Sequence, residues 1–232
     1  MVLPVREPYD WERVLDWLGT RAIPGLESVE DGVYRRGDVA VTRLEGGLSV
    51  TGEADPAVVA RVFDVAHDPA RLGPEPLFAR APGIRVPGAW SGWELAVRAV
   101  LGQQVSVAGA RRTAEKLVAL HGGDGFPPPE AVVDGELPGM PASRARALRA
   151  LAAAVVDGLA LDPPLDVEAA RTALLALPGF GPWTVEYIAM RALRDPDAWP
   201  GTDLWLKRAA TPAEAERWRP WRSYAAMAVW QP

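Results

Sequence analysis

The sequence of 232 residues contains no cysteine and only two histidines, His67 and His121. Without cysteine the chain has no disulfide, no cysteine nucleophile, no cysteinyl zinc site and no cysteine-ligated iron–sulfur cluster. Because the chain has only two imidazoles, few side chains are available for a histidine-containing catalytic triad or a histidine-based metal site. These two absences exclude or disfavour several large enzyme classes.

Long apolar runs are also missing. No run approaches the ~18 apolar residues of a membrane span, and residues 1–7 lack the apolar stretch of a secretory signal peptide. We therefore expect a cytoplasmic protein with no membrane partner. Hydrophobic residues are 49% of the chain and charged residues 24%, which is enough to form the core of one large or two small domains.

Lysine is almost absent, with only Lys116 and Lys207, and the net charge is −5. A nucleic-acid-binding protein usually has a basic binding face. The negative sum does not exclude one, because binding responds to the local field, and the arginines suit phosphate groups. The ten tryptophans, against four tyrosines and four phenylalanines, indicate either aromatic pockets or simply a tryptophan-rich core.

The chain divides into a part with short strand-like segments and a helical part. Turn-forming residues separate the expected strands, which are 26–34, 38–44 and 48–51. Proline and glycine are frequent in 68–87, which is expected to be a connection. From Ser91, whose spacing to Glu94 forms a capping-box pattern, the periodicity is helical.

The expected fold class is therefore α+β. A small N-terminal antiparallel sheet with helices is predicted for residues 1–87, and an all-helical domain for residues 88–232.

A tight turn between two expected helices, Leu177-Pro-Gly-Phe-Gly-Pro182, is the most informative motif. Gly179 and Gly181 allow backbone conformations and close approach that a Cβ would block. The first amides of the following helix have no intrahelical partner, so they can bind a phosphate oxygen. Such a hairpin contacts the DNA backbone and does not distinguish sequences. On spacing alone, an ordinary helix–Gly–helix turn is an equally good interpretation.

Asp203 follows a Pro-Gly turn and begins another expected helix. Taken alone, it is best interpreted as a helix N-cap. A carboxylate at this place also has a chemical use, because cleavage of an N-glycosidic bond develops positive charge on the sugar. At ~4 Å and an effective dielectric constant of ~20, the pair is worth roughly 4 kcal/mol, or about a thousandfold in rate. The carboxylate could also orient or deprotonate water.

The hairpin segment and the residues that follow it resemble the helix-hairpin-helix DNA glycosylase superfamily, in particular the 3-methyladenine DNA glycosylase II (AlkA-type) family. The similarity extends over nearly the whole chain. Besides the hairpin it includes Pro8-Tyr-Asp-Trp11, Arg98-Ala-Val-Leu-Gly-Gln-Gln-Val-Ser-Val107 and Arg219-Pro-Trp-Arg-Ser-Tyr224. Several separated matches in the right order are more specific than one hairpin.

The resemblance implies a monofunctional glycosylase that removes alkylated purines, of the 3-methyladenine and 7-methylguanine type, in base excision repair. Asp203 is the matching catalytic acid. Bifunctional members of the superfamily have a lysine directly after the hairpin, where this chain has Trp183, so no Schiff-base nucleophile is expected. The expected partner is double-stranded DNA with damaged bases, bound by a monomer.

The resemblance also implies roles for further residues. Aromatic residues are expected to line a pocket for the flipped base: Trp183, Tyr187, Trp230 and Trp17. Contacts with DNA are expected from Gln103, Gln104, Gly179, Phe180, Gly181, Thr184, Lys207 and Arg208. No cofactor is expected to be required. A structural sodium or potassium ion could be held by the backbone carbonyls of Leu175, Leu177 and Phe180.

Two positions depart from the family pattern. Gln104 stands where family members have an apolar side chain that fills the gap of the flipped base, and Leu204 replaces an expected aromatic residue. These changes leave open a glycosylase for a deaminated or oxidised base. Two further hypotheses are a helix-hairpin-helix protein that binds DNA without catalysis and a helical protein that binds a small apolar ligand.

Overall fold

The computed structural model describes residues 1–123 and 125–231, so the predicted domain end at 232 lies outside it. The chain begins with a five-stranded antiparallel sheet in the order β1-β5-β4-β3-β2. The strands are β1 (Val2–Pro4), β2 (Glu27–Glu30), β3 (Val33–Arg36), β4 (Val39–Leu44) and β5 (Gly47–Thr51). The expected fold class, an antiparallel sheet followed by helices, is confirmed.

The sheet differs from the sequence-based expectation in two respects. The segment predicted as one strand, 26–34, contains β2 and the first two residues of β3. These strands form a hairpin whose turn is Asp31 and Gly32, both with positive φ. An Asp-Gly pair is a strong signal for such a turn. The edge strand β1 was not predicted, because three residues give too short a pattern.

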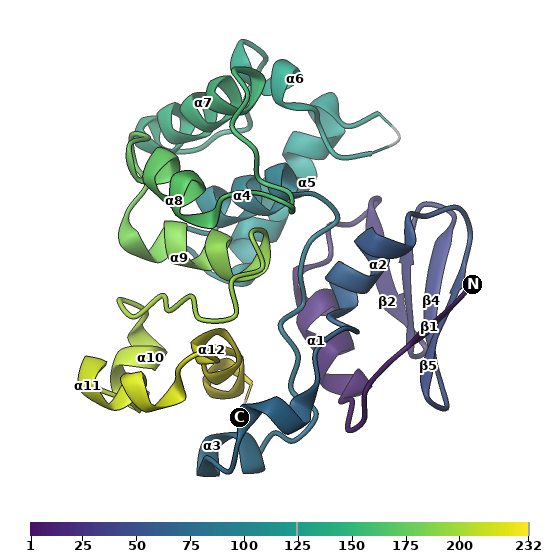
Figure 1. Cartoon of the computed structure of the whole chain (residues 1–232). Helices are drawn as coiled ribbons and strands as arrows, with labels where there is room; N and C mark the ends of the chain where they lie inside the picture. Colours follow the sequence, from purple (N-terminus) through teal and green to yellow (C-terminus); the bar gives the residue numbers. More distant parts are fainter. Residues whose placement is uncertain (124, 232) are drawn as a thin grey trace.

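Helices α1 (Trp11–Arg21) and α2 (Pro56–Phe63) cover the sheet (Figure 1). Both begin at an aspartate whose side chain accepts a backbone N–H, Asp10 and Asp55. Val14 and Leu15 of α1 pack into the core of the sheet, whereas Trp17 packs into the core of the helical part. Helix α1 therefore contributes to both cores.

The helical part begins with α4 (Gly92–Leu101), which is buried along almost its whole length. Around it lie α5 (Val107–His121), α6 (Pro129–Val133), α7 (Ala142–Val156), α8 (Val167–Leu175) and α9 (Pro182–Arg191). A second group consists of α10 (Leu204–Ala209), α11 (Pro212–Ala215), the 3₁₀ turn η2 (Glu216–Trp218) and α12 (Arg222–Trp230). Figure 1 shows this second group next to α9 and apart from α6 and α7.

The connection predicted over 68–87 is more ordered than expected, with η1 (Pro69–Leu72) and α3 (Pro76–Ala79). Leu72, Phe78 and Ile84 pack into the helical core, although they lie before the predicted domain boundary at 87, which stays a prediction. None of the helices in 1–123 and 125–231 is long and apolar enough to cross a membrane.

Candidate active site

Four aromatic side chains from three helices meet beside Asp203. Trp183 and Tyr187, one turn apart on α9, stack with their ring centroids 5.1 Å apart. Trp230, at the end of α12, lies 6.1 Å from Tyr187 and stacks on Trp17 at 5.9 Å. These residues and Asp203 line one cleft of about 480 Å³. The structure thus brings together all four residues predicted for the base pocket and the predicted acid.

Asp203 is fixed by four N–H donors. It is the N-cap of α10, and its Oδ1 accepts the backbone N–H groups of Trp205 at 2.9 Å and Leu206 at 3.3 Å. The indole Nε1 of Trp183 donates to Oδ2 at 3.2 Å, and that of Trp230 to Oδ1 at 3.1 Å. The two interpretations of Asp203 are therefore compatible, since the side chain caps a helix and lines the cleft.

Two guanidinium groups that the sequence analysis missed lie beside the aromatic rings of the cleft. Arg21 lies over the ring of Trp17, its Cζ 3.4 Å from the centroid. Arg191 is buried, donates to the Tyr187 hydroxyl at 2.6 Å, and also bonds the carbonyls of Pro87 and Gly88. For Arg191 the sequence did contain one signal: it follows Tyr187 by four residues on the same expected helix, a spacing that places the two side chains next to each other.

These cations change the acidity of the phenol. Burial would raise the pKa of Tyr187, but the charges of Arg191 and Arg21 together lower it below its ordinary value. The Tyr187 oxygen accepts from Arg191, so its own O–H remains able to donate. The cleft therefore combines aromatic faces with hydrogen-bond donors.

The predicted hairpin joins α8 and α9. Gly179 has φ +82°, and a Cβ there would lie 3.0 Å from the Cβ of Ala147, so both conformation and packing require glycine. Gly181 has φ −96° and open space where a Cβ would be. The fold itself thus does not require glycine at 181. The open space beside this residue allows close approach of a group from outside the protein, such as a phosphate. Phe180 is buried and anchors the loop, so its side chain is not placed to make the predicted contact with DNA.

Gln103 and Gln104 follow α4 and differ in their surroundings. The Gln103 side-chain amide donates to the Gly179 carbonyl and to the Thr184 hydroxyl, each at 3.0 Å. The Thr184 side chain is buried and is not placed to contact DNA. The predicted contact of Thr184 with DNA can therefore come only from its backbone amide. Gln104 is exposed and has φ +56°. Gln103 thus ties its loop to the hairpin, and Gln104 is directed outward.

The predicted basic residues Lys207 and Arg208 are exposed in the last turn of α10. Of the carbonyls predicted to hold a cation, that of Leu177 accepts the N–H of Phe180 at 3.2 Å. Carbonyl oxygens are suitable ligands for a hard cation, and one bond leaves a lone pair on this oxygen. Within 1–123 and 125–231, no group of three His, Asp or Glu side chains forms a metal site.

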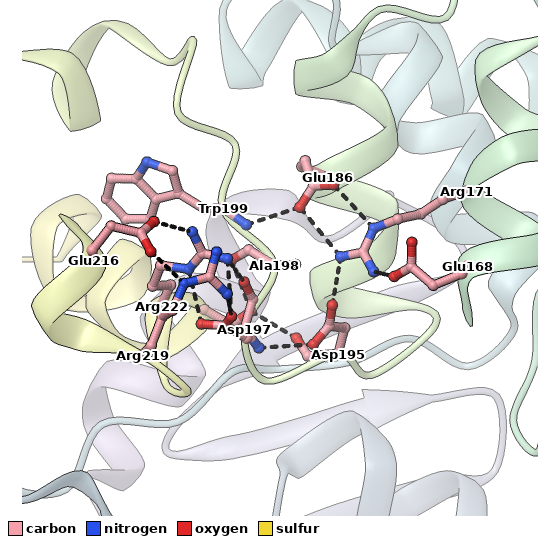
Figure 2. A network of polar contacts seen from close by, with 11 residues as sticks. Glu168, Arg171, Glu186, Asp195, Asp197, Ala198, Trp199, Glu216, Arg219 and Arg222 are labelled. Carbon is pink, nitrogen blue, oxygen red and sulfur yellow. Dashed lines mark hydrogen bonds and ion pairs between the residues drawn. The ribbon is translucent and has the colours of Figure 1, made fainter. Parts of the chain in front are cut away.

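A charged network supports the segment before Asp203 (Figure 2). Glu186 of α9 accepts from Arg171 of α8 at 3.0 Å and from the backbone N–H of Trp199 at 2.9 Å. On the other side, Arg222 of α12 donates to Asp197 at 2.8 Å. The loop 195–199 is therefore tied both to the helix of Trp183 and to the helix of Trp230.

Comparison with known proteins identifies the family of this chain. The AlkA N-terminal domain family model matches residues 1–72. A protein of Mycobacterium tuberculosis named probable bifunctional transcriptional activator/DNA repair enzyme AlkA is 39% identical, covering 98% of this chain and 56% of the relative. This chain thus spans about half of that relative. DNA-3-methyladenine glycosylase 2 of Escherichia coli is 34% identical, covering 96% of this chain and 94% of the relative.

Among solved structures, the 3-methyladenine DNA glycosylase of Archaeoglobus fulgidus superposes with a TM-score of 0.76 at 20% identity. The match covers 99% of this chain and 96% of that one. At this identity the superposition supports the fold, while the Escherichia coli relative, matched over nearly its whole length, supports the family. The chain therefore belongs to the AlkA family of DNA-3-methyladenine glycosylases.

Proposed function

We propose that this protein is a monofunctional DNA glycosylase that hydrolyses the N-glycosidic bond of alkylated purines in DNA, of the 3-methyladenine and 7-methylguanine type. It would leave an abasic site, the first intermediate of base excision repair. The observation that carries the proposal is the meeting of Asp203 with Trp183, Tyr187 and Trp230 in one cleft.

The damaged base must leave the duplex to reach this cleft. Methylation at N3 of adenine or N7 of guanine makes the base cationic, and the face of an indole or phenol ring attracts a cation by ~0.5–2 kcal/mol. A cationic base is also a good leaving group. The stacked rings of α9 and the indole of Trp230 therefore suit an alkylated purine without reading one particular edge.

Asp203 would stabilise the positive charge that develops on the deoxyribose as the bond breaks. Its four N–H donors hold the carboxylate in one orientation. The base leaves with the electron pair of the glycosidic bond, water adds to the sugar carbon, and the water proton passes to Asp203 or to solvent. Trp183 occupies the place of a lyase lysine, so water is the nucleophile.

Duplex DNA would be held by the first amides of α9, which no side chain caps among the described residues. Gly181 allows close approach of the phosphodiester, and Gln104, Lys207 and Arg208 are exposed on the protein surface. A monovalent cation on the carbonyls of Leu175, Leu177 and Phe180 would stabilise the hairpin and takes no part in the chemistry. A monomeric cytoplasmic enzyme belongs to the same proposal.

A second candidate, a glycosylase for deaminated or oxidised bases, is favoured by one observation. Among the other charged groups that line the cleft, Glu27 and Glu94 are paired with Arg98. Arg21 and Arg191 place two positive charges beside the rings of Trp17 and Tyr187. Such charges oppose a cationic base and suit a neutral base with carbonyl oxygens. The two candidates therefore differ in the charge of the preferred base.

The test is incubation of wild type and Asp203→Asn with methylated duplex DNA, followed by alkali. We expect free 3-methyladenine or 7-methylguanine and alkali-labile sites from the wild type, and a loss of about a thousandfold in the variant. Full activity of the variant would contradict the role of Asp203. Parallel duplexes with a deaminated or an oxidised purine distinguish the two candidates by their excision rates.

The monofunctional mechanism has its own test. No strand break is expected before alkali, and no covalent adduct after borohydride. A trapped adduct would instead indicate an amine nucleophile and a lyase activity.

A further inference from the structure

Trp205, in the first turn of α10, has an unusual position for a tryptophan. Its side chain is 61% exposed, and that of the preceding Leu204 is 58% exposed. Among the described residues it is the single aromatic one in the set of large apolar side chains that are exposed. Because an indole gains much from burial, an exposed one beside a functional cleft indicates a contact with a partner.

Trp205 belongs to the rim of the cleft that holds Asp203. Its backbone N–H donates to Asp203 Oδ1 at 2.9 Å, so the backbone that carries the indole is fixed relative to the proposed catalytic acid. Two further exposed apolar residues, Val105 and Val107, line the same cleft from the start of α5. Exposed apolar side chains from α10 and from the start of α5 therefore line this cleft.

Positive charge accompanies this indole. The guanidinium of Arg208 lies 5.4 Å from the ring centroid of Trp205, and Lys207 is adjacent in the same turn. An exposed aromatic ring beside cations is the combination with which proteins bind unpaired bases and the phosphates next to them. The local charge thus suits DNA, although the whole chain is acidic.

Flipping a nucleotide leaves its neighbours without a stacking partner. Gln104, the exposed residue of the loop after α4, can hydrogen-bond the orphaned base, but an amide offers little stacking surface. Position 104 therefore offers a hydrogen-bonding group and no apolar stacking surface, whereas Trp205 presents an exposed aromatic ring at the rim of the cleft that holds Asp203.

We propose that Trp205 stacks on a DNA base beside the flipped nucleotide and supplies the stacking surface that Gln104 lacks. This inference rests on the proposed function, because it requires the damaged base to occupy the cleft. It assigns a DNA contact to an exposed residue of α10, separate from the hairpin between α8 and α9.

The test compares affinities for a duplex that contains a stable abasic-site analogue, measured by fluorescence anisotropy at one salt concentration. Trp205→Ala is expected to bind about tenfold or more weakly, as loss of one base–aromatic stack predicts. Trp205→Phe, which keeps an aromatic ring, should stay within about threefold of the wild type. Leu44→Ala removes an exposed apolar residue of the sheet and serves as the control, with unchanged affinity.

A second measurement reports stacking directly. With 2-aminopurine next to the analogue, wild type should quench its fluorescence, and Trp205→Ala should quench it less. Equal affinity and equal quenching in wild type and Trp205→Ala would overturn the proposal.

Failure of the proposed function looks different. A wild-type protein that neither binds nor excises would contradict both proposals, whereas an active wild type matched by Trp205→Ala in affinity and quenching would contradict this one alone.

Discussion

The indole N–H groups of Trp183 and Trp230 are the least expected part of the site. Tryptophan was predicted here for its ring face, yet each indole also donates to a different oxygen of Asp203. The rings can thus stack on a base while their edges fix the carboxylate. One residue type serves two purposes because its apolar face and its single donor point in different directions.

We predict that Trp183→Phe lowers the excision rate about tenfold. Phenylalanine retains an aromatic face but lacks the N–H that reaches Asp203, and a hydrogen bond to a charged group is worth ~1.5 kcal/mol or more. The measurement is the single-turnover rate on methylated DNA. Trp11→Phe is the matched control, because it removes an indole bond to the Gly32 carbonyl at the sheet. An equal loss in both variants would contradict a specific role for the Trp183 N–H.

At the scale of elements, the position of Asp203 depends on two helices that are far apart in the sequence. Helix α9 carries Trp183 and α12 carries Trp230, and the loop 195–199 is bonded to both. Ser223 of α12 also donates to the carbonyls of Asp195 and Ala198. The network of Figure 2 therefore maintains the spacing of the two indoles that hold the carboxylate.

Glu186→Ala tests this positioning. The change removes the acceptor for Arg171 and for the Trp199 backbone N–H, so we expect the single-turnover rate to fall about tenfold. DNA affinity should change little, because the hairpin remains. Glu168→Ala is the control: Glu168 pairs with the same arginine, at 2.7 Å, but its side chain is largely exposed, and exposed pairs contribute little.

A drop in rate for Glu186→Ala that matched the loss of folded protein would contradict positioning. Rates are therefore compared at a temperature where circular dichroism shows both variants folded. Glu186→Gln should recover part of the rate, because its amide oxygen can still accept from Trp199.

At the scale of the whole molecule, buried charges join the sheet to the helices. Arg36 of β3 bonds Glu94 of α4 at 2.6 Å, and Arg98 of α4 bonds Glu27 of β2 at 2.6 Å. Burial would raise the pKa of Glu94, but Arg98 and Arg36 hold it below the ordinary value. The cleft is lined in part by this network, so the packing of the two cores helps to shape the base pocket.

A second junction lies around Asp64, at the end of α2. Its carboxylate accepts from Arg194, from the Tyr224 hydroxyl and from the backbone of Val86. His67 stacks on Tyr224 with ring centroids 3.9 Å apart, and its buried Nε2 has no partner among the described residues. Burial lowers the pKa of His67 to about 4, against the opposing charge of Asp64.

This histidine makes stability depend on pH. Because its folded pKa lies below its unfolded value of 6.5, the unfolded chain binds the extra proton between about pH 6.5 and 4. The contribution of neutral His67 is therefore complete above pH 6.5 and is lost as the pH falls toward 4, to a total of at most about 3 kcal/mol.

We expect His67→Phe to reduce the fall in melting temperature between pH 6.5 and 4.5 relative to the wild type. Nearby charges of Asp64, Asp68, Arg85 and Arg194 are unchanged in this variant, so the difference between the two curves isolates the imidazole. Identical pH dependence in both proteins would contradict the assignment. His121→Phe is the control for the other histidine of the chain.

Local features of the protein followed from the sequence alone: the caps at Ser91 and Asp203, the succession of sheet and helices, and the hairpin before α9. These features depend on residues a few positions apart. The sequence motifs also indicated the acid and the aromatic residues of the cleft, although their catalytic and binding roles stay predictions.

Which groups meet is a property of the three-dimensional arrangement. Residue spacing does not reveal that the indole of Trp230 reaches Asp203, that Gln103 is bonded to the hairpin while Gln104 is exposed, or that Arg191 bonds the carbonyls of 87 and 88. The physical reason is that these contacts join segments from different helices and loops. Their geometry follows from how the two cores pack, which a local pattern of residues does not specify.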